Sequence, residues 1–264
     1  MHPILLSFGD IKIYTYGVSM ALSFTIAIYL ALKRTEKEKK NPIITLDLSF
    51  WVLISSIIGA RILFILTRWD EYLQYPMEML KIWKGGLVYY GGLIGAVIGG
   101  SVYLRTKRAP AFVYLDIIAP YAALGLAIHR ALGCFVGTGC CYGKSTDLPW
   151  GVTFPAGSPA ASAFGPNVPI HPTQLYESLN GLFIFLFLRW FARYKKIVHG
   201  EESALFFIIY SVDRFVIEFF RGDRVRGFVG PLSTSQFISI LMFITGVGLF
   251  WWFRTQKTKA ATTS

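Results

Sequence analysis

Three apolar segments of this chain are each long enough to cross a lipid bilayer, and none of them contains a charged residue. They are residues 14–32, 85–104 and 228–253. A helix needs about 20 mostly apolar residues to cross the hydrocarbon core, so these segments favour a membrane protein over a soluble domain. The composition agrees, since 54% of the 264 residues are hydrophobic and 16% are aromatic.

Four further apolar segments are interrupted by charged residues: 48–67, 112–135, 175–190 and 203–222. Together, the segments predict an all-α, polytopic integral membrane protein with seven transmembrane helices. We expect a single membrane-embedded domain over residues 1–264. The N-terminal stretch lacks the basic region of a cleavable signal peptide, so we expect the first helix to be retained.

The distribution of Lys and Arg predicts the orientation, because cytoplasmic loops carry an excess of these residues. Basic clusters follow the first, third, fifth and seventh predicted helices, at residues 33–40, 105–108, 189–196 and 254–259. All four fall on one side, which predicts an N-terminus outside and a C-terminus in the cytoplasm. A basic inner surface facing anionic lipid headgroups accounts for the net charge of +11 without nucleic acid as a partner.

One long loop, at about 143–174 and rich in Pro, Gly and Ala, is predicted to be extracytoplasmic. A loop of this length is typical of a mobile flap over a site. A connector that only fills space explains it equally well.

Residues 210–223, YSVDRFVIEFFRGD, place charges inside the predicted sixth helix. Each residue of a helix advances about 100°, so Tyr210, Arg214, Glu218 and Arg221 share one face. A charge near mid-membrane costs about 3 kcal/mol, so such a stripe must pair, face the bundle or line a wet cavity. A structural pair between Arg214 and Glu218 at i,i+4 is one explanation.

Arg61, Arg130 and Glu177 also lie in apolar surroundings, and a buried ion pair is a weak source of stability. The predicted orientation puts Arg130, Glu177 and Arg221 towards the outer ends of their helices. An arginine-rich cavity there suits an anionic headgroup, because guanidinium groups bind phosphate oxygens bidentately.

The stretch HPTQLYES lies at a predicted junction between loop and helix, where Pro172 and Thr173 are suited to start the helix. Its polar side chains that can face a ligand are those of His171, Gln174, Tyr176 and Glu177.

The stretch LVYYGGLIGAVIGG has glycines four residues apart, at Gly91, Gly95 and Gly99, a spacing that lets helices pack closely. Tyr90, just before them, either belongs to an interfacial belt or reaches the cavity.

The three cysteines, Cys134, Cys140 and Cys141, form no CxxC motif, and no His/Cys spacing resembles a zinc site. We therefore expect no metal ligands among them. They are either packing residues or, because this region is predicted to lie outside, include a disulfide between Cys134 and one neighbour.

Seven motifs in order resemble the bacterial prolipoprotein diacylglyceryl transferase family: YGVSMAL, GARILF, YYGGLIGA, DIIAP followed by HRALGCF, HPTQLYES, Y-x-x-x-RF-x-x-EFFR-x-D and LSTSQFIS. Members of this family move the diacylglyceryl group of phosphatidylglycerol onto the lipobox cysteine thiol of a preprolipoprotein, and release glycerol 1-phosphate. The resemblance covers nearly the whole chain and implies a seven-helix transferase of lipoprotein biosynthesis. It also implies a multi-pass protein of the bacterial cytoplasmic (inner) membrane, with its active site towards the outer leaflet. Its partners would be phosphatidylglycerol, the lipobox of the signal peptide and membrane lipids, with no cofactor.

The resemblance and the charge pattern together predict the site residues. The predicted catalytic residues are Arg130, Arg214, Tyr90 and Glu218, with the two arginines bracketing the phosphate. The predicted substrate-binding residues are Tyr16, Arg61, His171, Gln174, Glu177, Tyr210 and Arg221.

This chain departs from the family pattern in two places. Many members have His-Gly-Gly before LIG, where this chain has Tyr90. After Arg130, the pattern Gly-Asn-Phe becomes Gly-Cys-Phe at 133–135 with one extra residue between, and the acidic residue expected downstream falls among 139–141. The group that removes the thiol proton is therefore not identified, and the candidates are, in order, Glu218, His171 and His129.

A non-enzymatic protein that binds or transports anionic lipid is the alternative, because the same arginines would hold its phosphate. The sequence has no paired broken helices of the kind that repeat transporters use, which favours the enzyme. Metal-dependent phosphoryl transfer would need a carboxylate cluster for Mg²⁺, and Asp213, Glu218 and Asp223 do not share a helix face.

Overall fold

The computed structural model describes residues 2–8, 11–81, 85–223 and 227–262. The chain forms two compact units, one of residues Met1–Leu30 with Leu115–Ser264 and one of residues Ala31–Tyr114. Helices predominate, as predicted.

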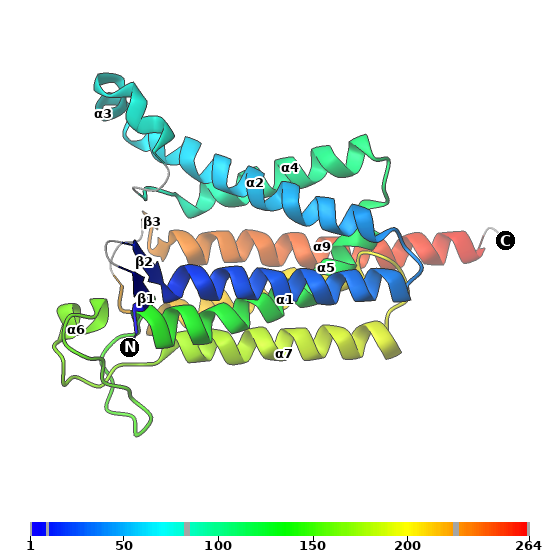
Figure 1. Ribbon diagram of the computed structural model, residues 1–264. Coiled ribbons are helices and arrows are strands. Elements are labelled where there is room, and N and C mark those ends of the chain that lie inside the picture. Colours follow the sequence, from blue (N-terminus) through cyan, green and yellow to red (C-terminus); the bar gives the residue numbers. More distant parts are fainter. Residues whose placement is uncertain (1, 9–10, 82–84, 224–226, 263–264) are drawn as a thin grey trace. The chain divides into compact units, whose positions relative to one another are not determined.

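The first unit contains most of the elements. They are β1 (Ile4–Phe8), β2 (Ile11–Tyr14), most of α1 (Thr15–Lys37) and of α5 (Ala111–His129), the π-helix η3 (Arg130–Thr138), α6 (Pro159–Phe164), α7 (Thr173–Tyr194), α8 (Glu201–Phe220), β3 (Phe228–Val229), β4 (Leu232–Ser233) and α9 (Thr234–Thr262). Its long helices run along a common direction (Figure 1). Ala119 and Ala123 of α5 pack against Ile184 and Leu188 of α7 at the centre of this bundle.

Both short sheets of the described chain are antiparallel hairpins, β1 with β2 and β3 with β4. The all-α prediction missed them, because short alternating stretches beside long apolar runs carry a weak strand signal. Both hairpins lead directly into a long helix, α1 or α9.

The long loop at 143–174 has a small core of its own, made by the buried side chains of Phe154, Ala160 and Ile170. Backbone bridges join Ile170 to Ser145 and to Val152. The loop and α6 lie at the same end of the bundle as the β1–β2 hairpin (Figure 1).

The second unit consists of α2 (Pro42–Thr67), α3 (Trp69–Gln74), a 3₁₀ turn η1 (Pro76–Leu80) and α4 (Tyr89–Thr106). Glycines hold α2 and α4 in close contact: a Cβ on Gly95 would clash with the Ser55 carbonyl, and one on Gly99 with the Ser55 hydroxyl. The predicted role of Gly95 and Gly99 in close helix packing is confirmed.

Five helical segments of the described chain are long and apolar enough to cross a membrane: 15–37, 42–67, 111–138, 173–194 and 234–256. They confirm a helical membrane protein. The other two predicted spans form α4 and α8, which have 18 and 20 residues. They are not among the five: α4 includes Arg105, and α8 carries five charged residues. Seven spans therefore stay a prediction.

Candidate active site

The carboxylate of Glu177 is the centre of a cluster of three arginines. Its Oε2 atom lies 2.6 Å from Nε of Arg130, and its Oε1 atom lies 3.1 Å from Nη1 of Arg221 and 3.7 Å from Nη1 of Arg214. The three arginines come from η3, from α8 and from the residue after α8. We call these four residues the arginine cluster.

The start of α7 places Glu177 in this position. The helix begins at Thr173, directly after Pro172, as the sequence predicts. Thr173 Oγ1 donates a hydrogen bond to the carbonyl of Cys141 at 2.7 Å, and Gln174 Nε2 donates to the carbonyl of Cys140 at 2.9 Å. The first turn of α7 is thereby fixed to the segment that follows η3, and Glu177 lies one turn further along.

The polar face predicted for α8 is present, and Arg214 on this face makes two contacts. Arg214 Nη2 forms the i,i+4 ion pair with Glu218 Oε2 at 3.0 Å and donates to Ser235 Oγ of α9, also at 3.0 Å. The structural pair considered from the sequence therefore exists. The same guanidinium also faces Glu177, so the pair is part of the larger cluster.

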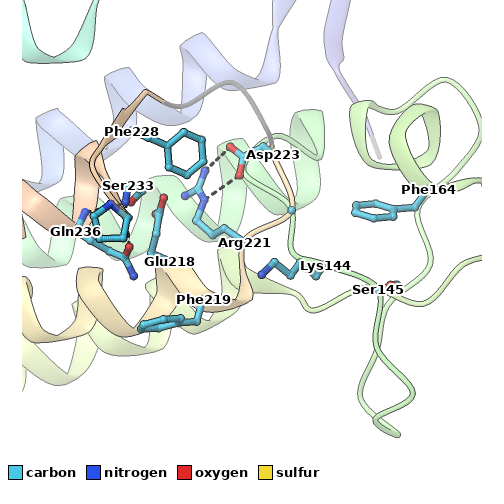
Figure 2. A pocket seen from close by; sticks show the side chains of 12 residues that line it. Lys144, Ser145, Phe164, Glu218, Phe219, Arg221, Asp223, Phe228, Ser233 and Gln236 are labelled. Carbon is cyan, nitrogen blue, oxygen red and sulfur yellow. Dashed lines mark hydrogen bonds and ion pairs between the residues drawn. The ribbon is translucent and has the colours of Figure 1, made fainter.

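Arg221 is the residue after the end of α8, and its backbone is extended. Its guanidinium is held bidentately by Asp223, with N–O distances of 3.0 and 2.7 Å (Figure 2). Burial opposes its charge, but hydrogen bonds to Asp223 and the Glu177 carboxylate raise the pKa of Arg221 above its ordinary value. Arg221 is therefore a fixed positive charge.

Two buried arginine atoms in the described chain have no hydrogen-bond partner, Nε of Arg130 and Nη1 of Arg214. Both lie near Glu177, but their N–H bonds do not point at its oxygens with good geometry. A buried donor without an acceptor is costly. Among the described residues, Glu177 Oε2 lacks a hydrogen-bond partner as well, so charge attraction rather than an aligned hydrogen bond holds Arg130 and Glu177 together.

A cavity of about 520 Å³ opens beside the cluster. Figure 2 shows Arg221, Glu218 and Asp223 on one side, with Lys144 and Phe164 from the long loop on another. The other labelled residues that line it are Ser145, Phe219, Phe228, Ser233 and Gln236. The cavity combines fixed charges with aromatic walls, which suits a ligand that is part polar and part apolar.

The remaining predicted residues of the first unit lie around these elements. Tyr210 stacks on Phe206 with ring centroids 5.7 Å apart and packs against the α5–α7 core. The ring of Tyr16 meets the edge of His129 at 4.7 Å. His171 Nδ1 lies 3.3 Å from the hydroxyl of Tyr176.

Arg61 and Tyr90 belong to the second unit. The guanidinium of Arg61 is buried and donates to four backbone carbonyls, those of Glu78, Met79, Gly85 and Gly86. These bonds explain its burial by themselves, since they hold the connection between α2 and α4. Substrate binding by Arg61 stays a prediction. Tyr90 lies in the first turn of α4 and is partly buried.

A second group of buried charges lies where α7 is joined to α8. Asp116 is fully buried and accepts hydrogen bonds from the backbone N–H groups of Gly200 and Ser203 and from the Ser203 hydroxyl. Lys196 pairs with Asp116 at 2.9 Å and with Glu202 at 2.7 Å. These charges tie the α7–α8 turn to α5 and have a structural role.

The three cysteines have no disulfide and lie together. Their sulfur atoms are within 4.8 Å of one another. The sequence pattern does not reveal this group, because spacing rules for metal ligands do not detect sulfurs that a chain reversal brings together.

Comparison with known proteins covers nearly the whole chain. A family described as prolipoprotein diacylglyceryl transferase matches residues 3–252. A phosphatidylglycerol–prolipoprotein diacylglyceryl transferase of Clostridium tetani (strain Massachusetts / E88) is 38% identical over 250 residues, which are 95% of this chain and 97% of that protein. The protein named transferase 2 of Clostridium perfringens (strain 13 / Type A) is 36% identical over 95% and 94% of the two chains. The Finegoldia magna (strain ATCC 29328 / DSM 20472 / WAL 2508) transferase is 34% identical over 94% of each.

Proposed function

Because the chain belongs to the prolipoprotein diacylglyceryl transferase family, we propose that it transfers the diacylglyceryl group of phosphatidylglycerol to the lipobox cysteine of preprolipoproteins. The products are a thioether and glycerol 1-phosphate. The arginine cluster beside a cavity is the observation that supports a site for this reaction in the chain. Guanidinium groups match the phosphate of an anionic lipid, and Arg221 of the cluster lines the cavity.

The protein spans the cytoplasmic (inner) membrane seven times, with α4 and α8 as the additional spans, and acts as a single domain. Its N-terminus is outside and its C-terminus is cytoplasmic. The positions of the basic clusters support this orientation. The N-terminal hairpin and the last turns of α9 lie at opposite ends of the bundle (Figure 1), which fits termini on opposite sides of the membrane. The arginine cluster then faces the outer leaflet, at the depth of the headgroups.

Arg130 and Arg214 hold the phosphate of phosphatidylglycerol from two sides. The cysteine sulfur attacks the glycerol carbon that carries the phosphodiester, the C–O bond breaks, and both electrons of that bond go to the phosphate oxygen. Negative charge grows on this oxygen, so fixed positive groups stabilise the transition state more than the ground state. Glu177 keeps the arginines in place, and Arg221 adds a third positive charge.

The thiol must lose its proton, because a thiol with a pKa of about 8.5 is mostly protonated at neutral pH. The proton goes to a base and then to the released phosphate, so the reaction balances without a co-reactant. Glu218 is the first candidate for this base, because it lines the cavity. His171 and His129 follow, and Tyr90 assists the step from the position where many family members have a histidine.

The other predicted residues shape the binding site. Tyr16 and Tyr210 contact the lipid substrate, and so do His171 and Arg61. Gln174 acts through its bond to the Cys140 carbonyl, which keeps the start of α7 in register. The signal-peptide lipobox is the second substrate.

The test uses the full chain in detergent with phosphatidylglycerol and a lipobox peptide, and detects the peptide by mass spectrometry. We expect a mass gain equal to one diacylglyceryl group and an equal amount of glycerol 1-phosphate. Phosphatidylcholine serves as the control lipid and should give no product. Binding of phosphatidylglycerol without any thioether would contradict the enzyme and support the lipid carrier considered from the sequence.

A further inference from the structure

The group formed by Cys134, Cys140 and Cys141 is not explained by the transfer reaction. Cys134 lies in η3, and the chain reverses after Thr138, where Gly139 has a φ of 65° and Cys141 a φ of 61°. The reversal brings all three sulfurs within 4.8 Å of one another. Gly139 N–H also donates to the Cys134 carbonyl at 2.7 Å, which closes the turn.

Hydrogen bonds to their backbone carbonyls hold Cys140 and Cys141 in place. Their carbonyls accept hydrogen bonds from Gln174 and Thr173 at the start of α7. A rigid set of donor atoms is what a closed metal site requires. Zn–S bonds of about 2.3 Å with tetrahedral angles put two sulfurs about 3.8 Å apart. The observed spacing of at most 4.8 Å is within about an ångström of that value.

His129 lies beside Cys134 and is the candidate for a fourth ligand. Its Nε2 atom lies 3.9 Å from Cys134 Sγ, and its Nδ1 atom lies 3.1 Å from Ser19 Oγ. The Ser19 hydroxyl donates its own hydrogen to the Tyr16 carbonyl at 2.9 Å, so it accepts a hydrogen bond from Nδ1–H. This leaves the lone pair on Nε2, towards the sulfurs. Metal-binding histidines are oriented in the same way, by a partner on the other ring nitrogen.

A positive charge lies beside the group. Arg130 Nη1 lies 3.8 Å from Cys134 Sγ. Thiolates are the form that binds metal.

We propose that Cys134, Cys140, Cys141 and His129 bind one Zn²⁺ ion in a closed, structural site. Three thiolates and one imidazole form one of the ligand sets of structural zinc, and a soft, sulfur-rich set disfavours Mg²⁺ and Ca²⁺. The ion would fix the segment after η3, and with it the position of Arg130. This inference does not depend on the transfer reaction, and with zinc bound His129 is no longer a candidate for the base.

The test measures zinc in the full chain purified in detergent with added Zn²⁺ and no chelator. We expect about one zinc per chain, measured by mass spectrometry of the metal, because the four ligands together bind a single ion. Cobalt in place of zinc should give the strong visible bands and the sulfur-to-metal absorption of a tetrahedral thiolate site. The cobalt spectrum is recorded on the unmodified chain, so it tests the site even if a substitution unfolds the protein.

Variants identify the ligands. Cys140→Ser and His129→Asn should lose the zinc, while the matched change His199→Asn, outside the group, should keep it. Ser19→Ala should weaken zinc affinity about 10-fold or more, because it removes the partner of Nδ1. A chain that takes up no zinc and carries either three free thiols or one disulfide, by alkylation and mass, would overturn the proposal.

Discussion

Glu177 of α7 and Arg130 of η3 meet with 2.6 Å between Oε2 and Nε, and the same carboxylate also faces Arg214 and Arg221. The Glu177 side chain is 5% exposed. One buried carboxylate thus neutralises part of three positive charges, which come from η3, from α8 and from the residue after α8. The arrangement keeps three guanidinium groups together inside an apolar bundle.

Glu177→Gln should destabilise the protein strongly. The change leaves three arginines close together, of which two are bonded to the remaining acids, and breaking a buried pair in this way costs about 3–5 kcal/mol. Thermal unfolding in detergent, followed by circular dichroism, measures the loss. Glu36→Gln, on the exposed surface of α1, is the matched control. Equal unfolding temperatures for the two variants would mean that Glu177 does not hold the cluster.

Asp116→Asn should lower stability while leaving the transfer rate per folded molecule unchanged. Asp116 accepts three hydrogen bonds and pairs with Lys196, and none of these partners belongs to the arginine cluster. We expect a loss of about 3 kcal/mol in unfolding free energy, compared with no change for the exposed Asp147→Asn. A variant as stable as the parent but inactive would contradict the structural role of this network.

Tyr90→Phe should slow the transfer. The change removes only the hydroxyl, which we assign to the deprotonation step at the position where many relatives have a histidine. A positioned group of this kind contributes about 10²–10⁴ in rate. The initial rate of thioether formation measures it, with the exposed Tyr75→Phe of the same unit as control. Equal rates for Tyr90→Phe and the parent would make Tyr90 an interfacial residue.

Periodicity predicted the parts of the site that lie on regular helices. The positions of Tyr210, Arg214 and Glu218 on one face follow from 3.6 residues per turn. The start of α7 follows from the proline and threonine before the apolar run. Contact between Glu177 and Arg221, which are 44 positions apart, could only be inferred from the expectation that both lie at the outer ends of their helices.

Contacts with the backbone could not be predicted in the same way. Arg61 looks like a ligand-binding charge in the sequence, yet four carbonyls of the turn before α4 satisfy it. The cysteine group depends on positive φ values at Gly139 and Cys141. Residue types predict such local geometry only weakly, because contacts in the tertiary structure determine it.

The rate of thioether formation by Arg214→Ala, beside that of Arg189→Ala, tests the central claim most directly. Arg189 lies on α7 and contacts the ring of Tyr121, outside the arginine cluster. If Arg214 stabilises the charge that grows on the leaving phosphate, its loss should slow transfer about 10²–10³-fold, while Arg189→Ala stays at the parent rate and both variants keep the parent's helical spectrum. A folded Arg214→Ala protein with the parent rate would contradict the assignment of the arginine cluster to the phosphate.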